Sequence, residues 1–171
     1  NNPGLKASII KTENEVLERA DVVFCSSQYL ANVQKKRSAR QKDIIVVNNA
    51  IQLPEMKEVK ADDMPENVKE KYRIVAGMDS VLMYIGTVAD WFDFALVENL
   101  LNDMPSVNLV VIGPLNTKNT LQHPRVHYLG SINRDYIFSF MNQADALIMP
   151  FIVNDLIESV NPVKLYEYIY S

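Results

Sequence analysis

The stretch Val81-Leu82-Met83-Tyr84-Ile85-Gly86-Thr87 is an unbroken apolar run that ends in a glycine and a hydroxyl-bearing residue. Apolar residues without polar alternation predict a strand that is buried on both faces, as in a parallel sheet covered by helices. Further apolar runs and helical patterns alternate with it down the chain: strands over 108–112, 126–129 and 146–151, and helices over 94–101 and 135–142. The alternation predicts an α/β fold with a doubly wound parallel sheet, Rossmann-like in type.

The pattern before residue 80 is less regular. Apolar runs over 21–26 and 44–47 predict two more strands, and a short helix over 15–19 precedes them. A helix that begins at Ser26 or Ser27 should end in the basic run Lys35-Lys36-Arg37, which is a solvated face or, alternatively, a membrane-surface contact. The dipeptide Asn48-Asn49 predicts a turn, because asparagine tolerates the left-handed conformation.

Between Pro54 and Pro65 the chain is polar, charged and free of glycine, which predicts a linker or surface excursion. A helix over 67–78 should follow it. The first residues, 1–4, and the last, 168–171, do not look like natural ends of a domain, so we expect an excised piece of a longer protein.

The composition of the 171 residues is that of an ordinary globular protein, with 48% hydrophobic and 22% charged residues. A net charge of −4 gives no electrostatic case for binding nucleic acid. Without a run of about 18 apolar residues or a signal-peptide pattern, we expect a cytoplasmic protein. The single cysteine, Cys25, lies in an apolar run and is expected to be a buried thiol rather than a catalytic one.

Several familiar ligand-binding patterns are missing from the sequence. There is no Asp-x-Asp pair, and His123 and His127 are the only histidines, so a histidine-rich metal site is not expected. Neither a Gly-x-Gly-x-x-Gly loop nor a Gly-x-x-x-x-Gly-Lys-Ser/Thr loop occurs, which disfavours dinucleotide oxidoreductases and P-loop NTPases.

Near the C-terminus, the run Asn161-Pro162-Val163-Lys164-Leu165-Tyr166-Glu167-Tyr168 predicts a helix whose N-terminus could bind an anion. Asn161 is a suitable N-cap, and Pro162 suits the first helical position. Lys164 and Glu167 then share one face of the helix. The free N–H groups, the helix dipole and the lysine would together seat a diphosphate, while the glutamate could accept hydrogen bonds from a ribose. On spacing alone, a capped helix with a solvated Lys–Glu pair is the alternative.

The sequence resembles the donor half of GT-B-type glycosyltransferases, most closely the bacterial branch with a P-x-K-x-x-E-Y helix that makes cell-surface polysaccharides. The likeness is carried by this helix together with four other segments in the same order: 83–87 (MYIGT), 110–114 (VVIGP), 127–130 (HYLG) and 145–151 (DALIMPF). It covers roughly residues 80–171, and residues 10–55 resemble the end of the partner domain more loosely.

The resemblance implies a Rossmann-like half of a GT-B fold in three parts. Residues 1–55 would end the N-terminal, acceptor-side domain, residues 56–79 would be a linker and helix, and residues 80–171 would be the donor nucleotide-sugar-binding domain, truncated at its C-terminus. Acceptor-binding residues would then lie outside the chain, so the piece alone is expected to be inactive.

The resemblance also implies the site residues, which converge at the carboxyl ends of the strands. Lys164 and Glu158 would be catalytic. The nucleotide-sugar-binding residues would be Gly86, Thr87, Gly113, Gly130, Ile132, Asn161, Pro162, Val163, Lys164 and Glu167, with no metal and no cofactor. Trp91 could stack on a sugar but is more often a packing residue, and Arg134 could approach the base or ribose or simply be solvated.

Two features depart from the family pattern. Glu158 and Glu167 are separated by eight residues where many relatives have seven, which puts the role of Glu158 in doubt. No basic residue occurs between Gly86 and Asn116, so Lys164 would carry more of the diphosphate alone.

The implied function is transfer of a hexose from a nucleotide-diphosphate sugar to a glycan or lipid-linked acceptor, by a retaining, metal-independent hexosyltransferase. A lipid-linked acceptor would bring peripheral contact with the inner face of the membrane. The alternatives are a non-catalytic nucleotide-binding or interaction module on the same fold, and a nucleotide-sugar epimerase.

Overall fold

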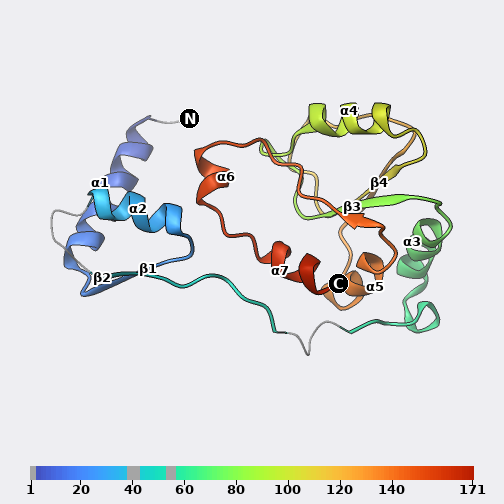
Figure 1. Cartoon of the computed structure of the whole chain (residues 1–171), viewed down its shortest axis with the longest axis horizontal. Coiled ribbons are helices and arrows are strands. Elements are labelled where there is room, and N and C mark those ends of the chain that lie inside the picture. The colour runs from blue at the N-terminus through green and yellow to red at the C-terminus, as the bar shows by residue number, and fades with distance from the viewer. Residues whose placement is uncertain (1–2, 38–42, 53–56) are drawn as a thin grey trace. The chain divides into compact units, whose positions relative to one another are not determined.

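The computed structural model describes residues 3–37, 43–52 and 57–171, with two α/β units (Figure 1). One unit comprises the chain up to Ala50 together with Val153–Val163. The other comprises Ile51–Ile152 and Lys164–Ser171. Residues 153–163, which the sequence analysis placed in the donor domain, thus group with the N-terminal unit. The predicted boundary at residues 55 and 56 lies outside the described residues.

The N-terminal unit has two parallel strands, β1 (Val22–Cys25) and β2 (Asp43–Val46), close to the predicted ranges. Its helices are α1 (Pro3–Arg19), α2 (Gln28–Arg37) and α6 (Asp155–Ser159). The short helix expected over 15–19 is therefore only the last part of α1. Helix α6, which contains Glu158, is capped by the side chain of Asn154.

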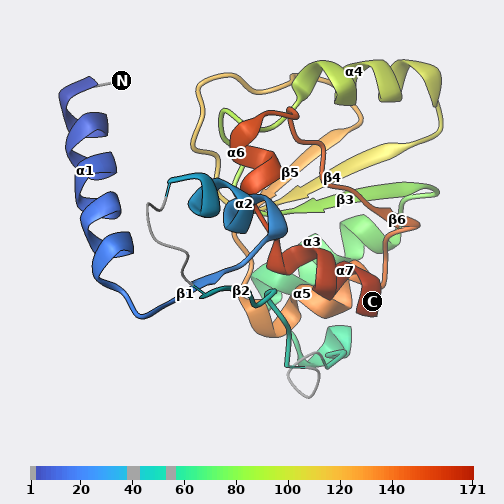
Figure 2. The same cartoon turned by 60° about the vertical axis from the view of Figure 1, so that its left-hand side comes forward.

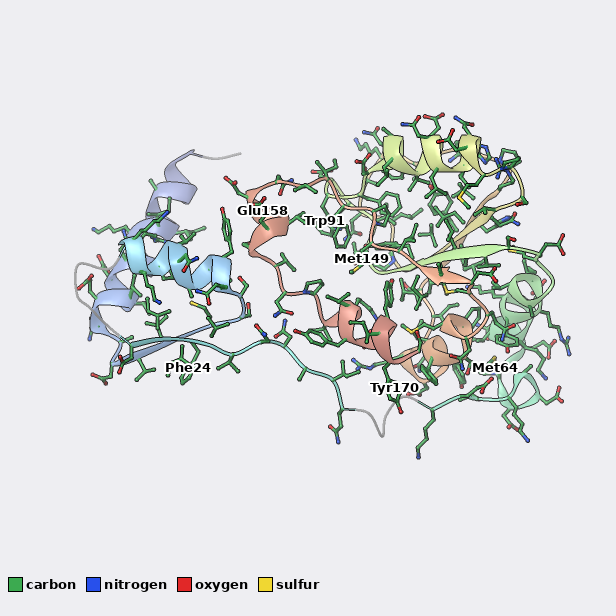
Figure 3. All side chains as sticks on the ribbon, in the orientation of Figure 1. Phe24, Met64, Trp91, Met149, Glu158 and Tyr170 are labelled. Carbon is green, nitrogen blue, oxygen red and sulfur yellow. The ribbon has the colours of Figure 1, made fainter. Side chains whose placement is uncertain are left out.

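The two strands of this unit have one face open. Cys25 is buried, as expected, but Phe24 is 67% exposed and lies on the side of the strands away from α2 (Figure 3). The hydroxyl of Ser27 accepts a hydrogen bond from the Leu30 N–H, which confirms a serine at the start of α2. In the basic run at the end of α2, Arg37 forms an ion pair with Glu13 of α1 at 2.8 Å, so it is not simply a solvated charge.

The expected left-handed turn at Asn49 is wrong. In the described parts of the chain, every residue with positive φ is a glycine. The segment after β2 is extended, and the Asn49 side chain donates to the carbonyl of Asn161, 2.6 Å away. This long-range bond replaces the local turn that the asparagine pair predicted.

The second unit is built on a four-stranded, all-parallel sheet with the order β5-β4-β3-β6. The strands are β3 (Val81–Ile85), β4 (Asn108–Ile112), β5 (Val126–Gly130) and β6 (Ala146–Leu147). Numbered within this unit, the order is 3-2-1-4, which is that of half a Rossmann fold. The fold class is confirmed, although β6 is much shorter than the strand expected over 146–151.

Helices cover both faces of this sheet (Figure 2). On one face, α4 (Phe94–Asp103) contributes Val97 and Leu101 to a core with Tyr84 and Val111. On the other face lie α3 (Glu66–Ala76), α5 (Arg134–Met141) and α7 (Val163–Tyr170), with Phe140 fully buried. Burial on both faces explains why β3 and β4 are continuously apolar.

The polar segment before α3 is packed against the unit rather than being a loose linker. It contains a 3₁₀ turn, η2 (Ala61–Asp63), and Met64 is only 4% exposed. The fully buried hydroxyl of Ser139 accepts from the Val59 N–H at 2.7 Å and donates to the Val59 carbonyl at 3.1 Å. Most of residues 57–65 are exposed, as expected of a surface segment, but Val59 and Met64 fix it to the unit.

None of the helices within the described ranges is long and apolar enough to cross a bilayer.

Candidate functional site

The strand order places a topological switch point in the second unit, between β3 and β6. The chain leaves β3 toward β4 on one side, whereas β6 adds on the other side of β3. Ligands of open parallel sheets bind outside the carboxyl ends of the strands at such a point. The two strands also separate there, since their pairing stops at Met83 and Leu147 and continues only through the Ile148 N–H, which donates to the Met83 carbonyl.

Three glycines form a continuous main-chain floor at the carboxyl ends of β3, β4 and β5. The Gly86 N–H donates to the Ile112 carbonyl, and the Gly113 N–H donates to the Gly130 carbonyl, both at 2.9 Å. The Gly86 amide is therefore used by the sheet, and the assignment of Gly86 to the nucleotide-sugar site stays a prediction. Gly113 is required for another reason: a Cβ there would lie 2.1 Å from the Gly86 carbonyl oxygen.

The next residue, Thr87, keeps an available amide. Its carbonyl accepts hydrogen bonds from the Tyr84 hydroxyl (2.9 Å) and the Trp91 indole N–H (3.2 Å). For its own N–H, no acceptor is found within residues 3–37, 43–52 and 57–171. Trp91, labelled in Figure 3, thus helps to fix the main chain at Thr87 while this donor remains free at the switch point.

Helix α7 is anchored to the end of β3 by Tyr168. The Tyr168 hydroxyl accepts from the Ile85 N–H at 2.8 Å, a position where β6 no longer reaches β3. Burial raises the pKa of this hydroxyl above its usual range, so it stays protonated. The end of α7, at Ile169 and Ser171, lines the same groove as Asp145 and Ala146 at the start of β6. The helix therefore runs antiparallel to the strands, and its first turn lies at their carboxyl edge.

Glu167 is the most unusual charged residue of this edge. Its side chain is 6% exposed, and it contacts two cations: the Lys164 ammonium lies 2.6 Å from Oε2 and the Arg134 guanidinium lies 3.3 Å from Oε1. A carboxylate so deeply buried needs such partners. The lysine contact does not have hydrogen-bond geometry, so Oε2 keeps unused acceptor capacity among the described groups. The cluster can therefore accept hydroxyl donors and carries one net positive charge.

The residues before Lys164 behave differently from the prediction. The helix begins at Val163, so Pro162 precedes it and is not its first residue. Asn161 does not cap the helix; its side-chain amide donates to the Ser26 carbonyl at 2.9 Å. Asn161, Pro162 and Val163 belong to the N-terminal unit, so their assignment to the nucleotide-sugar site stays a prediction.

Glu158 also belongs to the N-terminal unit. It lies on α6 (Figure 3) and is exposed. Its charge and that of Asp155 act on Tyr29 of α2, whose pKa is raised first by burial and then by these two carboxylates. The structure therefore gives Glu158 neighbours from its own unit, and its catalytic role is untested.

The loop after β5 combines a special backbone with an apolar side chain. Gly130 has φ of +68°, and no atom lies within 4 Å of a Cβ built there, so conformation rather than space requires the glycine. Ile132 is half-buried against the core, and the Asn133 side chain then caps α5 by accepting from the Asp135 N–H. Gly130 and Ile132 thus reach the same carboxyl edge as Gly86.

Sequence reasoning missed two contributors to this edge. For Arg134 the sequence predicts either a contact with the base or ribose or a solvated side chain, and in the structure it pairs with the buried carboxylate of Glu167. Tyr168 was seen only as part of the helix motif, yet it closes the strand end. The position of Arg134, as the first residue of a helix that follows the glycine at a strand end, was the sequence feature that could have indicated its role.

The two histidines have structural partners. His123 Nδ1 accepts from the Arg125 N–H at 3.1 Å, and His127 Nε2 lies 3.3 Å from the Asn108 side-chain oxygen. Burial lowers the pKa of His127, which favours its neutral form.

Two hollows among the described residues have other linings. One, of about 710 Å³, lies between β6 and α7 and reaches from Ser171 to Met149 and Leu165; another, of about 670 Å³, runs along α1. Neither contains Lys164, Glu167 or Thr87. The candidate site is defined by the strand ends, the Thr87 donor and the charges around Glu167.

Comparisons with known proteins agree with the resemblance found in the sequence. The chain is 24% identical over 173 residues to the Bacillus subtilis (strain 168) protein named "Putative teichuronic acid biosynthesis glycosyltransferase TuaH", covering 96% of the chain and 42% of that protein. No family model matches the sequence.

Among solved structures, the fold is shared with Anabaena HepE. Its complex with UDP and glucose matches with a TM-score of 0.61 and 17% identity, over 82% of this chain and 40% of that one. Its complex with UDP-glucose matches equally well, over 82% and 41%. The chain thus spans about two fifths of the length of these relatives. Together, the sequence match and the shared fold confirm that this chain resembles part of a GT-B-type glycosyltransferase.

Proposed function

We propose that the second unit binds the donor of a glycosyltransferase that moves a hexose from a nucleotide-diphosphate sugar to a glycan or lipid-linked acceptor. The observation that carries the proposal is the buried Glu167 held between two cations at the carboxyl edge of the sheet. A surface helix gains nothing from burying a carboxylate in this way, because its desolvation costs several kcal/mol. Binding of ribose hydroxyls by Glu167 accounts for the burial.

The chemistry of transfer matches the groups present. As the bond between the anomeric carbon and the β-phosphate oxygen breaks, negative charge grows on the diphosphate. Lys164, the first amides of α7 and the free Thr87 amide would stabilise that charge without a metal. We propose a retaining outcome on the strength of the family resemblance, with Glu158 as the sugar contact.

The relatives suggest the first donor to test. HepE was solved with UDP and with UDP-glucose, so uridine diphosphate sugars are the first choice for this protein as well. We further propose that the protein is intracellular and meets a lipid-linked acceptor at the inner face of the membrane. Lys35 and Lys36, which are exposed at the end of α2, would contact the membrane surface.

The test is Lys164→Ala in the full-length enzyme. Removing a preorganised charge partner typically lowers turnover by about 10²–10³, or roughly 3–4 kcal/mol. Lys69→Ala is the matched control, because Lys69 also pairs with a glutamate three residues away on its helix, at 3.9 Å from Glu66. Near-normal turnover by the Lys164 variant would refute the proposal, and so would an equal loss in the control.

A non-catalytic interaction module on the same fold, with a vestigial nucleotide site, is the rival. The lack of a basic residue between Gly86 and Asn116 favours it. Calorimetric titration with uridine, guanosine and thymidine diphosphates separates the two: heat with one of them supports the enzyme, and silence with all three supports the module.

A further inference from the structure

The proposed donor site has an apparent shortage of positive charge. A nucleotide diphosphate brings at least two negative charges, and the loop after β3 supplies no basic side chain, since none occurs from Gly86 to Asn116. Another nearby lysine, Lys71, is committed elsewhere: its ammonium donates to the Leu129 carbonyl at 2.6 Å. Lys164 alone would leave the diphosphate only partly neutralised.

Arg134 supplies a second cation at the same edge. It opens α5 four residues after Gly130, and its guanidinium contacts Oε1 of the carboxylate whose Oε2 contacts Lys164. The two cations therefore lie on opposite oxygens of one buried group, within the same unit of the structure.

The arginine is the less firmly held of the two. Its contact is 3.3 Å against 2.6 Å for the lysine, and its side chain is 68% exposed against 36%. Because the guanidinium itself is largely in solvent and Lys164 remains on the other oxygen of the carboxylate, Arg134 can turn toward a ligand without leaving Glu167 unpaired. Its planar fork of donors suits phosphate oxygens, which it can bind in bidentate fashion.

We propose that Arg134 is a donor-binding residue that contacts the diphosphate, supplying the positive charge that the loop after β3 lacks. The inference rests on the proposed function, because it assigns a second ligand contact within that site. In the free protein Glu167 holds the guanidinium at the edge of the site; in the complex Glu167 accepts the ribose hydroxyls while Arg134 and Lys164 share the diphosphate.

The experiment compares ligands that differ only in phosphate number. UDP and UMP are titrated calorimetrically into the full-length protein at fixed ionic strength, and uridine is measured by displacement. With Arg134→Gln, we expect the Kd of UDP to rise about tenfold or more. UMP should weaken less and uridine should not change. Arg134→Lys keeps the charge but loses the planar set of guanidinium donors, so its Kd for UDP should lie between those of the wild-type protein and Arg134→Gln.

Arg73→Gln is the matched control, because Arg73 is 63% exposed and pairs with Glu66 at 3.8 Å on the outer helix α3. It should leave all three affinities unchanged. An unaltered UDP affinity in the Arg134 variant would overturn the inference. Equal weakening of uridine and UDP would overturn it too, since the arginine would then act on the nucleoside through Glu167. If the wild-type protein bound no uridine, guanosine or thymidine nucleotide, the proposed function itself would fail, which is a distinct result.

Discussion

The main-chain floor under the candidate site can be tested with one series of glycine-to-alanine substitutions. At Gly113, an added Cβ would meet the Gly86 carbonyl oxygen at 2.1 Å and its carbon at 2.7 Å, and φ is +142°. At Gly130, the space is open but φ is +68°. At Gly77, which ends α3, φ is −91° and the nearest atom is 3.4 Å away. The series therefore compares a position with both a steric clash and an unfavourable φ (Gly113), a position with an unfavourable φ alone (Gly130) and a position with neither (Gly77).

The expected losses of unfolding free energy follow from these differences. A non-glycine residue in the left-handed region costs about 1–2 kcal/mol, which is the whole effect at Gly130. At Gly113, both backbones are fixed in the sheet, so relief of the clash adds roughly 1–3 kcal/mol to a similar strain. Gly77→Ala should change stability by less than about 1 kcal/mol, since its conformation is open to alanine.

Urea unfolding followed by fluorescence is the assay. The only tryptophan of the protein, Trp91, lies in the second unit, so its emission reports that unit. With a slope of about 1–3 kcal/mol per molar urea, a loss of about 3 kcal/mol at Gly113 moves the midpoint down by roughly 1 M or more. A Gly113→Ala protein as stable as Gly77→Ala would refute the close approach of the two glycines. A Gly130 loss as large as that at Gly113 would refute the separation of clash from conformation.

One further substitution and one chemical modification test other features of the structure. Tyr168→Phe leaves the Ile85 N–H without its acceptor, so urea midpoints should show a loss of roughly 1–3 kcal/mol in the Trp91-reporting unit, and an unchanged midpoint would contradict the anchoring of α7. Burial raises the pKa of the Cys25 thiol, and the thiolate is the reactive form, so alkylation at pH 8 should be slow in the folded chain and fast in urea; equal rates would contradict its burial. Because the folded pKa is the higher one, this thiol's contribution to stability is present at neutral pH and declines as pH rises through that pKa.

The sequence alone was sufficient for the second unit's strands and for the class of fold. The strands β3 and β4 lie where predicted, because a strand buried on both faces is apolar over most of its length and a glycine follows each of these two runs. The caps that the structure shows at Asp93 and Asn133 depend on local residues, since a side chain there needs only an amide two or three residues away. The order of the motifs was also sufficient to identify the resemblance.

The sequence did not predict the contacts between distant parts of the chain. The sequence did not show that Asn161 would bond to Ser26 instead of capping its own helix, or that Ser139 would hold residue 59, because both outcomes are decided by partners 80 or more positions away. It did not place Arg134 on Glu167, and it did not show that the sheet uses the Gly86 amide while the Thr87 amide stays available. Periodicity and spacing describe what one segment can do by itself. Which donor stays free and which charges share a carboxylate depend on how the packed strands and helices bring separate segments together.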